Sequence, residues 1–221
     1  MMKKVFGGFT LAEILITLGI IGVVAAILIP TTMEKAQDWQ LKQAWKKEYS
    51  ILNQAYNEII SENGGTIRGA FSHVGWTEDS NKMLTLFKDK MKVIKYCTNP
   101  GITGSGSWHQ YPGTGHDELS VRNKQGTLQT FSGNVYPVMI LADGTLIHLY
   151  ASNVDGSSTP GFLIYGYIAI DVNGFKKPNV IGKDIFEVFI LENKLSPFGS
   201  LKYADTCDTT GQGCAAEYLY K

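Results

Sequence analysis

Residues 7–30 of this chain read Gly7-Gly-Phe-Thr-Leu-Ala-Glu-Ile-Leu-Ile-Thr-Leu-Gly-Ile-Ile-Gly-Val-Val-Ala-Ala-Ile-Leu-Ile-Pro30. Between Leu11 and Ile29 the only charged residue is Glu13. An apolar stretch of this length can cross a bilayer as a helix. A carboxylate costs roughly 2.5–3.5 kcal/mol near the bilayer centre, so Glu13 should have a partner or a purpose. The stretch therefore predicts a membrane helix with a functional acid near its beginning.

The residues on either side of this stretch follow a specific order. Lys3 and Lys4 form a short basic leader, Gly8 comes directly before Phe9, and Pro30 follows the apolar run. Leader, Gly-Phe pair, acid, apolar length and proline together resemble the N-terminus of type IV prepilins and of the pseudopilins of type II secretion systems. The resemblance covers Lys3 to about Ile60, roughly a quarter of the chain.

The resemblance implies how the chain is processed and assembled. Prepilin peptidase would cut between Gly8 and Phe9, and Phe9, the new N-terminus, would be N-methylated. In a filament Glu13 would pair with the amine of a neighbouring subunit's Phe9. The stretch from Gly22 to Pro30 would lose helical order in an assembly, whereas the isolated subunit would keep a kinked helix. The implied partners are the peptidase, other pilin or pseudopilin subunits and an inner-membrane assembly platform.

Two simpler interpretations fit the stretch less well. A secretory signal peptide has a shorter apolar region that is followed by small residues at its cleavage site, unlike this stretch. A plain single-pass anchor needs no carboxylate one turn into its apolar stretch. Lys3 and Lys4 fit the positive-inside tendency, so we expect the N-terminus in the cytoplasm and the bulk of the chain outside the bacterial inner membrane.

The helix is expected to continue beyond the membrane segment to Asn63. From Thr31 to Glu62 the chain has neither glycine nor proline, and Gly64-Gly65 then ends the helix. An apolar stripe at helical spacing predicts one face that packs against a domain. Its members are Leu41, Ala44, Trp45, Leu52, Ala55, Tyr56, Ile59 and Ile60. The polar face opposite carries Lys42, Lys46, Lys47, Asn53, Asn57 and Glu58.

The remaining residues predict a globular domain with helices and strands. Helical spacing favours a second helix over Ser80–Tyr96, and Asn99–His116 has the composition of a long surface loop. Strand-like stretches occupy Val135–Leu141, Thr145–Ala151, Phe162–Val172 and Ile185–Leu191, with a hairpin turn at Asp143-Gly144. We therefore expect an α+β fold, with the long helix packed on an antiparallel sheet of about four strands. The expected divisions are a leader (1–8), a membrane and assembly helix (9–30), an amphipathic half (31–63) and a globular pilin-like domain (64–221).

The segment from Asp171 to Asp184 joins the last two predicted strands. It resembles the loop in which some pseudopilins hold calcium, and the resemblance implies Asp171, Asn173 and Asp184 as oxygen ligands. The alternative is a turn in which Asp171 and Asn173 bond their own backbone and no metal binds. The alternative is the preferred interpretation from sequence.

Charge and cysteine content limit the kinds of partner and compartment expected for this chain. The chain has 20 basic and 20 acidic residues, so removing the leader with its two lysines would leave 18 basic against 20. This balance gives no reason to expect specific nucleic-acid binding. Cys207 and Cys214 bracket a short loop and favour a disulfide outside the cytoplasm. Pairing of Cys97 with either of them remains open. Closing the short loop would let the tail, Ala215 to Tyr220, rejoin the edge of the sheet.

No catalytic motif is found, and we expect no enzyme activity. The four histidines, His73, His109, His116 and His148, form neither a zinc pattern nor an H-E-x-x-H motif. Two function classes remain. The first is a structural subunit of a type IV pilus or pseudopilus, and the second is a membrane-tethered minor pilin or adhesin that presents its loops to a ligand.

Overall fold

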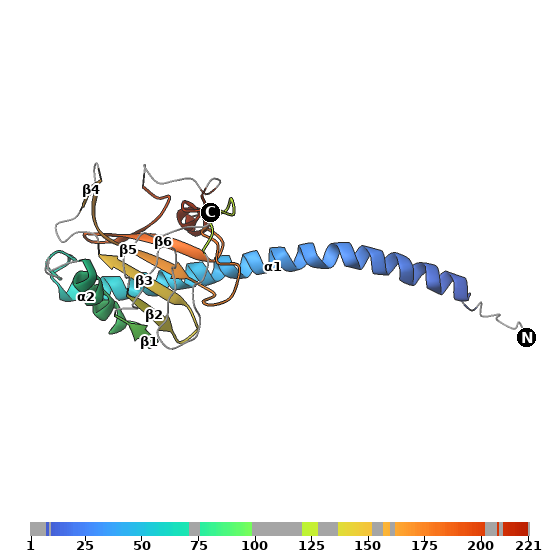
Figure 1. Cartoon of the computed structure of the whole chain (residues 1–221), viewed down its shortest axis with the longest axis horizontal. Helices are drawn as coiled ribbons and strands as arrows, with labels where there is room; N and C mark the ends of the chain where they lie inside the picture. Colours follow the sequence, from blue (N-terminus) through green and yellow to red (C-terminus); the bar gives the residue numbers. More distant parts are fainter. Residues whose placement is uncertain are drawn as a thin grey trace, which may run out of the picture. The chain divides into compact units, whose positions relative to one another are not determined.

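The computed structural model describes residues 8, 10–70, 76–98, 121–127, 137–151, 157–159, 162–201, 207 and 210–220. Contacts between Cα atoms divide the chain into two units, Met1–Gln40 and Leu41–Lys221. Phe9, the leader before Gly8 and the predicted loop Asn99–His116 lie outside the described residues. Helices, strands and their order are drawn in Figure 1.

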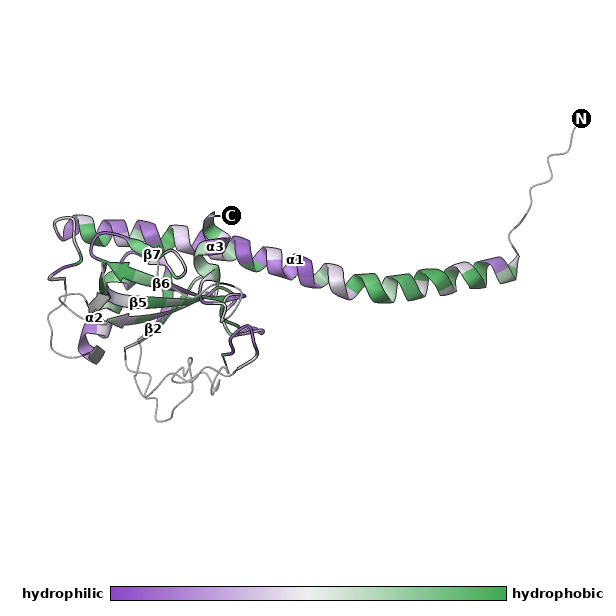
Figure 2. Ribbon diagram, turned by 90° about the horizontal axis from the view of Figure 1, so that it is seen from above, coloured by the Kyte–Doolittle hydropathy of each residue, from purple (hydrophilic) through white to green (hydrophobic). Residues whose placement is uncertain are grey.

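The first helix, α1, runs from Leu11 to Glu62 and includes Pro30. Its large apolar side chains from Leu11 to Ile29 are exposed, and by length and composition this part of α1 could cross a membrane. Figure 2 shows most of this part of the helix in green, the colour of hydrophobic residues. The first buried residue of α1 is Leu41. Residues 31–40 were predicted to belong with the amphipathic half of the helix, but they are grouped with the first unit.

The helix ends where the glycine pair predicts. Gly64 and Gly65 both have positive φ, 74° and 90°, a conformation in which glycine has no steric penalty. The N–H of Gly65 donates to the carbonyl of Ile60 at 2.6 Å, which satisfies one of the last carbonyls of the helix. The predicted end of α1 after Asn63 is therefore correct to within one residue.

The second unit contains an antiparallel sheet with the strand order β1-β2-β3-β5-β6-β7, and β4 pairs beside β5. Strands β2 and β3 form the predicted hairpin around Asp143-Gly144. The two longest strands, β5 and β6, pair with each other. The strands are β1 (Val93–Cys97), β2 (Val138–Leu141), β3 (Leu146–Ala151), β4 (Ser157–Thr159), β5 (Phe162–Asp171), β6 (Ile185–Leu191) and β7 (Leu195–Pro197). The two further helices are α2 (Trp76–Lys88) and α3 (Cys214–Tyr220).

The largest hydrophobic core lies between α1, α2 and one face of the sheet, and alternate residues of the central strands point into it. Two smaller clusters, around Ile185 and around Leu146, are formed by residues of the alternate positions. Trp45 of α1 is fully buried, stacks on Phe186 of β6 with ring centroids 4.7 Å apart, and donates its indole N–H to the carbonyl of Ala215. Tyr56 donates its hydroxyl to the carbonyl of Leu191. These contacts confirm the predicted α+β class, with the C-terminal part of α1 packed on an antiparallel sheet.

Three details of the prediction are wrong. The sheet has six strands on its main path, not about four, because the three-residue β7 and the exposed edge strand β1 give little sequence signal. The predicted second helix over Ser80–Tyr96 ends at Lys88, and its C-terminal part is β1, which pairs with β2. The tail was expected to rejoin the sheet edge, but it forms α3, where the N–H of Ala216 donates to the carbonyl of Phe198.

Candidate functional site

The beginning of α1 brings together Thr10 and Glu13. The carboxylate oxygen Oε2 of Glu13 accepts hydrogen bonds from the backbone N–H and the hydroxyl of Thr10, both at 2.8 Å. The N–H of Glu13 donates to the Thr10 hydroxyl oxygen at 3.3 Å. This reciprocal arrangement is a capping box, which satisfies N–H groups that have no partner within the helix. Gly8, immediately before Phe9, is exposed and lies outside the helix.

The capping box was missed in the sequence analysis, although the signal was present. Threonine followed three residues later by glutamate, before an apolar run, is the pattern that predicts it. The structure thus gives Glu13 a partner within its own chain. Both Thr10 hydrogen bonds go to Oε2, and a carboxylate has about four acceptor positions, so Oε1 keeps acceptor capacity for a further donor.

Gly22 and Pro30 lie on other turns of α1, away from Glu13 along the helix. A Cβ placed on Gly22 would have no atom within 4 Å, so nothing in the subunit itself requires glycine there. Near Pro30, the hydroxyls of Thr31 and Thr32 donate to carbonyls of the preceding turn, those of Leu28 and Ile29. The expected loss of helical order in an assembly stays a prediction.

The connection between β5 and β6 brings the two predicted acids together. Asp171 ends β5 and Asp184 immediately precedes β6, and both side chains are fully buried. The N–H of Val172 donates to the carbonyl of Asp184 at 2.9 Å. The oxygen Oδ1 of Asp171 accepts the N–H groups of Asn173 and Gly174, while the two oxygens of Asp184 accept those of Asn179 and Val180.

Burial of these acids affects their protonation. Burial raises the pKa of Asp171 to about 8, despite the two N–H groups that its carboxylate accepts. Burial, together with the nearby charge of Asp171, raises the pKa of Asp184 to about 6. Two buried carboxylates that repel each other resist simultaneous ionisation unless a proton or a cation compensates their charge.

The donor set of the connection fits a hard cation such as calcium. Besides the two carboxylates, the amide oxygens of Asn173 and Asn179 are buried without a hydrogen-bond donor in the described part of the chain. Calcium prefers oxygen ligands of these kinds. In the described residues no group of three His, Cys, Asp or Glu side chains gathers, so such a site would depend on amide and carbonyl oxygens as well. The Asx turn at Asp171 is present too and is compatible with either interpretation.

Calcium is expected to stabilise the second unit at pH 8. At this pH a bound cation would compensate the charge of the two buried carboxylates, and binding at 100 times Kd adds about 2.7 kcal/mol. Thermal unfolding with millimolar calcium, magnesium or a chelator measures the effect. In Asp171→Asn the amide oxygen can keep the turn while the charge is lost, so the calcium effect should disappear. Equal unfolding temperatures for the parent protein with calcium and with chelator would rule the site out.

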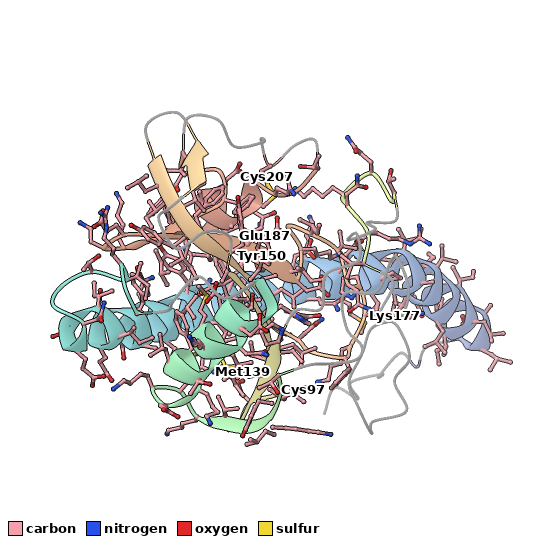
Figure 3. All side chains as sticks on the ribbon, turned by 60° about the vertical axis from the view of Figure 1, so that its left-hand side comes forward. Cys97, Met139, Tyr150, Lys177, Glu187 and Cys207 are labelled. Carbon is pink, nitrogen blue, oxygen red and sulfur yellow. A yellow bond between two sulfur atoms is a disulfide. The ribbon has the colours of Figure 1, made fainter. Side chains whose placement is uncertain are left out.

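The disulfide and the β5–β6 connection are packed on each other. Cys207 and Cys214 are bonded, and Cys97 on β1 is a free thiol, well apart from Cys207 in Figure 3. A Cβ on Gly182 would lie 2.4 Å from the carbonyl oxygen of Gly211 and 2.9 Å from Sγ of Cys214. The disulfide loop therefore supports the segment that precedes Asp184.

A third polar cluster, on α1, was not predicted. Glu48 lies on the buried face of the helix at 2% exposure, and its oxygen Oε1 is 3.0 Å from Nζ of Lys47. Lys47 also forms an ion pair with Asp143 in the β2–β3 turn. Burial raises the pKa of Glu48 to about 7, and its hydrogen bond with Asp143 contributes in the same direction. Burial opposes ionisation of Asp143, but hydrogen bonds from Lys47 and Glu48 lower its pKa below the ordinary value.

The stability of the second unit is expected to fall as pH rises from about 4.5 to 7 through Glu48. Because its pKa is raised on folding, the folded state binds more protons than the unfolded state over this interval. The contribution is on the order of 3 kcal/mol. Asp143 has a lowered pKa, so its contribution is already complete above pH 4 and does not change over the interval. Urea unfolding at several pH values should show a weaker pH dependence for Glu48→Gln than for the parent, and identical dependence would contradict the assignment.

Comparison with models of protein families, with curated proteins and with solved structures found no match to this chain.

Proposed function

We propose that this protein is a structural subunit of a type IV pilus or of a type II secretion pseudopilus. The observation that carries the proposal is Glu13, a carboxylate at the beginning of an exposed apolar helix, four residues after Phe9 of the Gly8-Phe9 pair. A membrane anchor alone gains nothing from an acid at this position. The subunit is held in the bacterial inner membrane by α1, with the second unit outside, until it is assembled.

Cleavage after Gly8 is the first step of this function. Prepilin peptidase removes the leader and leaves Phe9 as the N-terminal residue, which is then methylated. The exposed position of Gly8 outside the helix supports access by a protease at the membrane surface. In sequence the new N-terminal residue directly precedes Thr10, the residue that caps α1.

Assembly then uses both acceptor oxygens of Glu13. In the free subunit Oε2 stays bonded to Thr10, and in the filament Oε1 accepts the amine of a neighbouring subunit's Phe9. A charge-assisted contact of this kind is stronger in apolar surroundings than in water. The exposed apolar side chains between Leu11 and Ile29 leave lipid and pack against the helices of neighbouring copies.

Filament recovery tests the proposal. The chain is produced together with prepilin peptidase and an inner-membrane assembly platform, and filaments are sheared from the cells, labelled with an antibody and imaged. We expect the chain in the sheared fraction and along the filaments. If it remains entirely in the membrane fraction while the same platform assembles another pilin, the subunit function is wrong.

A further inference from the structure

The two sulfur atoms of the disulfide have different polar neighbours. Nζ of Lys124 lies 3.2 Å from Sγ of Cys207, and the hydroxyl oxygen of Tyr218 lies 3.9 Å from the same sulfur. Sγ of Cys214 instead lies 3.4 Å from the carbonyl oxygen of Cys207. The sulfur of Cys207 therefore has a cation and a hydroxyl beside it, whereas the sulfur of Cys214 has a hydrogen-bond acceptor beside it.

These neighbours favour different protonation states once the disulfide is reduced. An ammonium and a hydroxyl group stabilise a thiolate, whereas a carbonyl oxygen accepts the S–H of a neutral thiol. The thiolate is the form that attacks a disulfide. Cys207 also keeps 6% of its surface exposed, whereas Cys214 is fully buried. Charge and access thus both favour Cys207 as the first thiol to react.

Contacts of residues 121–127 hold Lys124 beside the disulfide loop. The backbone N–H of Lys124 donates to the carbonyl of Thr210 at 3.3 Å, and a Cβ on Gly211 would lie 3.1 Å from Cγ of the lysine. The side chain of Lys124 therefore extends along the loop to the sulfur of Cys207. Because Lys124 is exposed, solvent screens its charge and its effect on the thiol is moderate.

Backbone packing holds the two cysteines together independently of the bond between them. Their Cα atoms are 4.3 Å apart. Gly182 lies directly against Gly211, and a Cβ on Gly199 would lie 2.5 Å from the carbonyl oxygen of Gly213. The loop is thus packed between two other segments of the chain. Reduction removes one bond and leaves these contacts, so we expect the two thiols to stay close to each other.

We propose that Cys207 is the nucleophilic thiol of a redox-active pair, in which Lys124 stabilises its thiolate and Cys214 is the resolving thiol. The co-reactant is a disulfide. The thiolate of Cys207 attacks one sulfur of the co-reactant, forms a mixed disulfide and releases the other sulfur as a thiolate. Cys214 then loses its proton to water and attacks the sulfur of Cys207, which closes the loop and releases the second thiolate. The protein gives up two electrons, and the co-reactant is reduced to two thiols.

Charged groups of both signs lie on the elements that surround the loop. Lys42 of α1 lies 4.1 Å from the centre of the tyrosine ring of α3, and Glu217 lies on that helix too. Lys183 lies in the β5–β6 connection, and Glu187 of β6 accepts a hydrogen bond from the glutamine of the loop. The ammonium of Lys124, in contrast, is in contact with the sulfur itself.

Two acids next to Cys207 in the sequence must be separated from the effect of Lys124. Asp205 and Asp208 lie outside the described residues. Their carboxylates would disfavour a thiolate, so Asp205→Asn/Asp208→Asn would speed up the reaction of Cys207 or leave it unchanged, whereas removal of the lysine charge would slow it. Because the two effects have opposite signs, each can be measured in its own variant.

Reaction of the reduced protein with oxidised glutathione tests the assignment. The full chain in detergent is reduced, freed of reductant, exposed to oxidised glutathione and quenched in acid for peptide mapping. We expect Cys214→Ser to accumulate the mixed disulfide on Cys207, and Cys207→Ser to form it on Cys214 at least about tenfold more slowly. Cys97, well apart from Cys207 in Figure 3, is the internal reference in each sample.

Lysine variants separate an effect of charge from an effect on structure. Lys124→Met should slow the reaction of Cys207 about three- to tenfold at pH 7, and it should no longer slow it at pH 10, where the thiol is ionised in both proteins. Lys124→Arg should keep the rate of the parent. So should Lys176→Met, which removes an exposed lysine of the β5–β6 connection.

Faster reaction of Cys214 than of Cys207 would overturn the proposal, and so would the same pH profile for Lys124→Met and the parent. Proteolysis before and after reduction shows whether the reduced chain stays folded. A reduced chain that unfolds would also overturn the proposal, because the pair would then not be held together. A chain that never polymerises would still show every expected result, so the failure of the proposed function is distinguishable from the failure of this inference.

Discussion

Glu13→Leu is expected to leave the protein in the membrane and to reduce its incorporation into filaments by ten- to a hundredfold. Removing the carboxylate eliminates a cost of insertion, so membrane association should be unchanged or stronger. The hydrogen bond to a neighbour's amine is lost at the same time. Hydrogen bonds to charged groups contribute about 1.5–3 kcal/mol, and each 1.4 kcal/mol corresponds to a factor of ten. Quantifying the chain in sheared filaments and in membranes measures both effects.

Two further variants separate charge from capping. Glu13→Gln can keep the capping box with Thr10 but has no charge, so it should assemble as poorly as Glu13→Leu. Thr10→Ala removes the cap and keeps the charge, so it should assemble far better than either. If Glu13→Gln assembles normally and Thr10→Ala does not, the carboxylate serves only to begin the helix, and the pairing model is wrong.

Trp45→Ala is expected to destabilise the second unit by about 3–5 kcal/mol. The substitution removes a fully buried ring stacked on Phe186 and leaves the carbonyl of Ala215 without its indole donor. Domains of this size are stable by about 5–15 kcal/mol, so a large part of the total would be lost.

Trp39 provides the matched control because it lies on the same helix at 64% exposure, two residues before burial begins. Trp39→Ala should change stability by no more than about 0.5 kcal/mol. Pulse proteolysis across a urea series measures both variants without relying on tryptophan fluorescence. Equal midpoints for Trp45→Ala and Trp39→Ala would contradict the packing of α1 on the sheet.

The sequence predicted the elements whose pattern is local. The stripe that includes Leu41, Trp45 and Tyr56 is the face of α1 that is buried, and the predicted bounds of β6 are those observed. The turn at Asp143-Gly144 was also predicted from its Asp-Gly pair, and in the structure Gly144 has a positive φ of 93°. Each of these elements can be predicted from the spacing of its apolar residues or from a residue that favours a particular backbone conformation.

Elements decided by tertiary contacts were missed. Met91 and Ile94 continue the helical spacing of α2, but Ile94 is 69% exposed on an edge strand that pairing with β2 holds in place. Glu48 lies on the buried face of α1, although a charged residue is expected at the surface. The cation of Lys47 and a hydrogen bond with Asp143, from a turn far along the chain, compensate for its burial, and no local pattern contains the approach of Asp143.

The most direct test of the central claim is the intact mass of the protein extracted from membranes of a host that contains prepilin peptidase. The account predicts loss of Met1 to Gly8 and a mature chain that begins with Phe9, heavier by one methyl group where the peptidase also methylates. Gly8→Ala should slow or block this removal, because the methyl group adds bulk at the cleaved bond. A chain that keeps Met1 in the presence of an active peptidase would contradict the account.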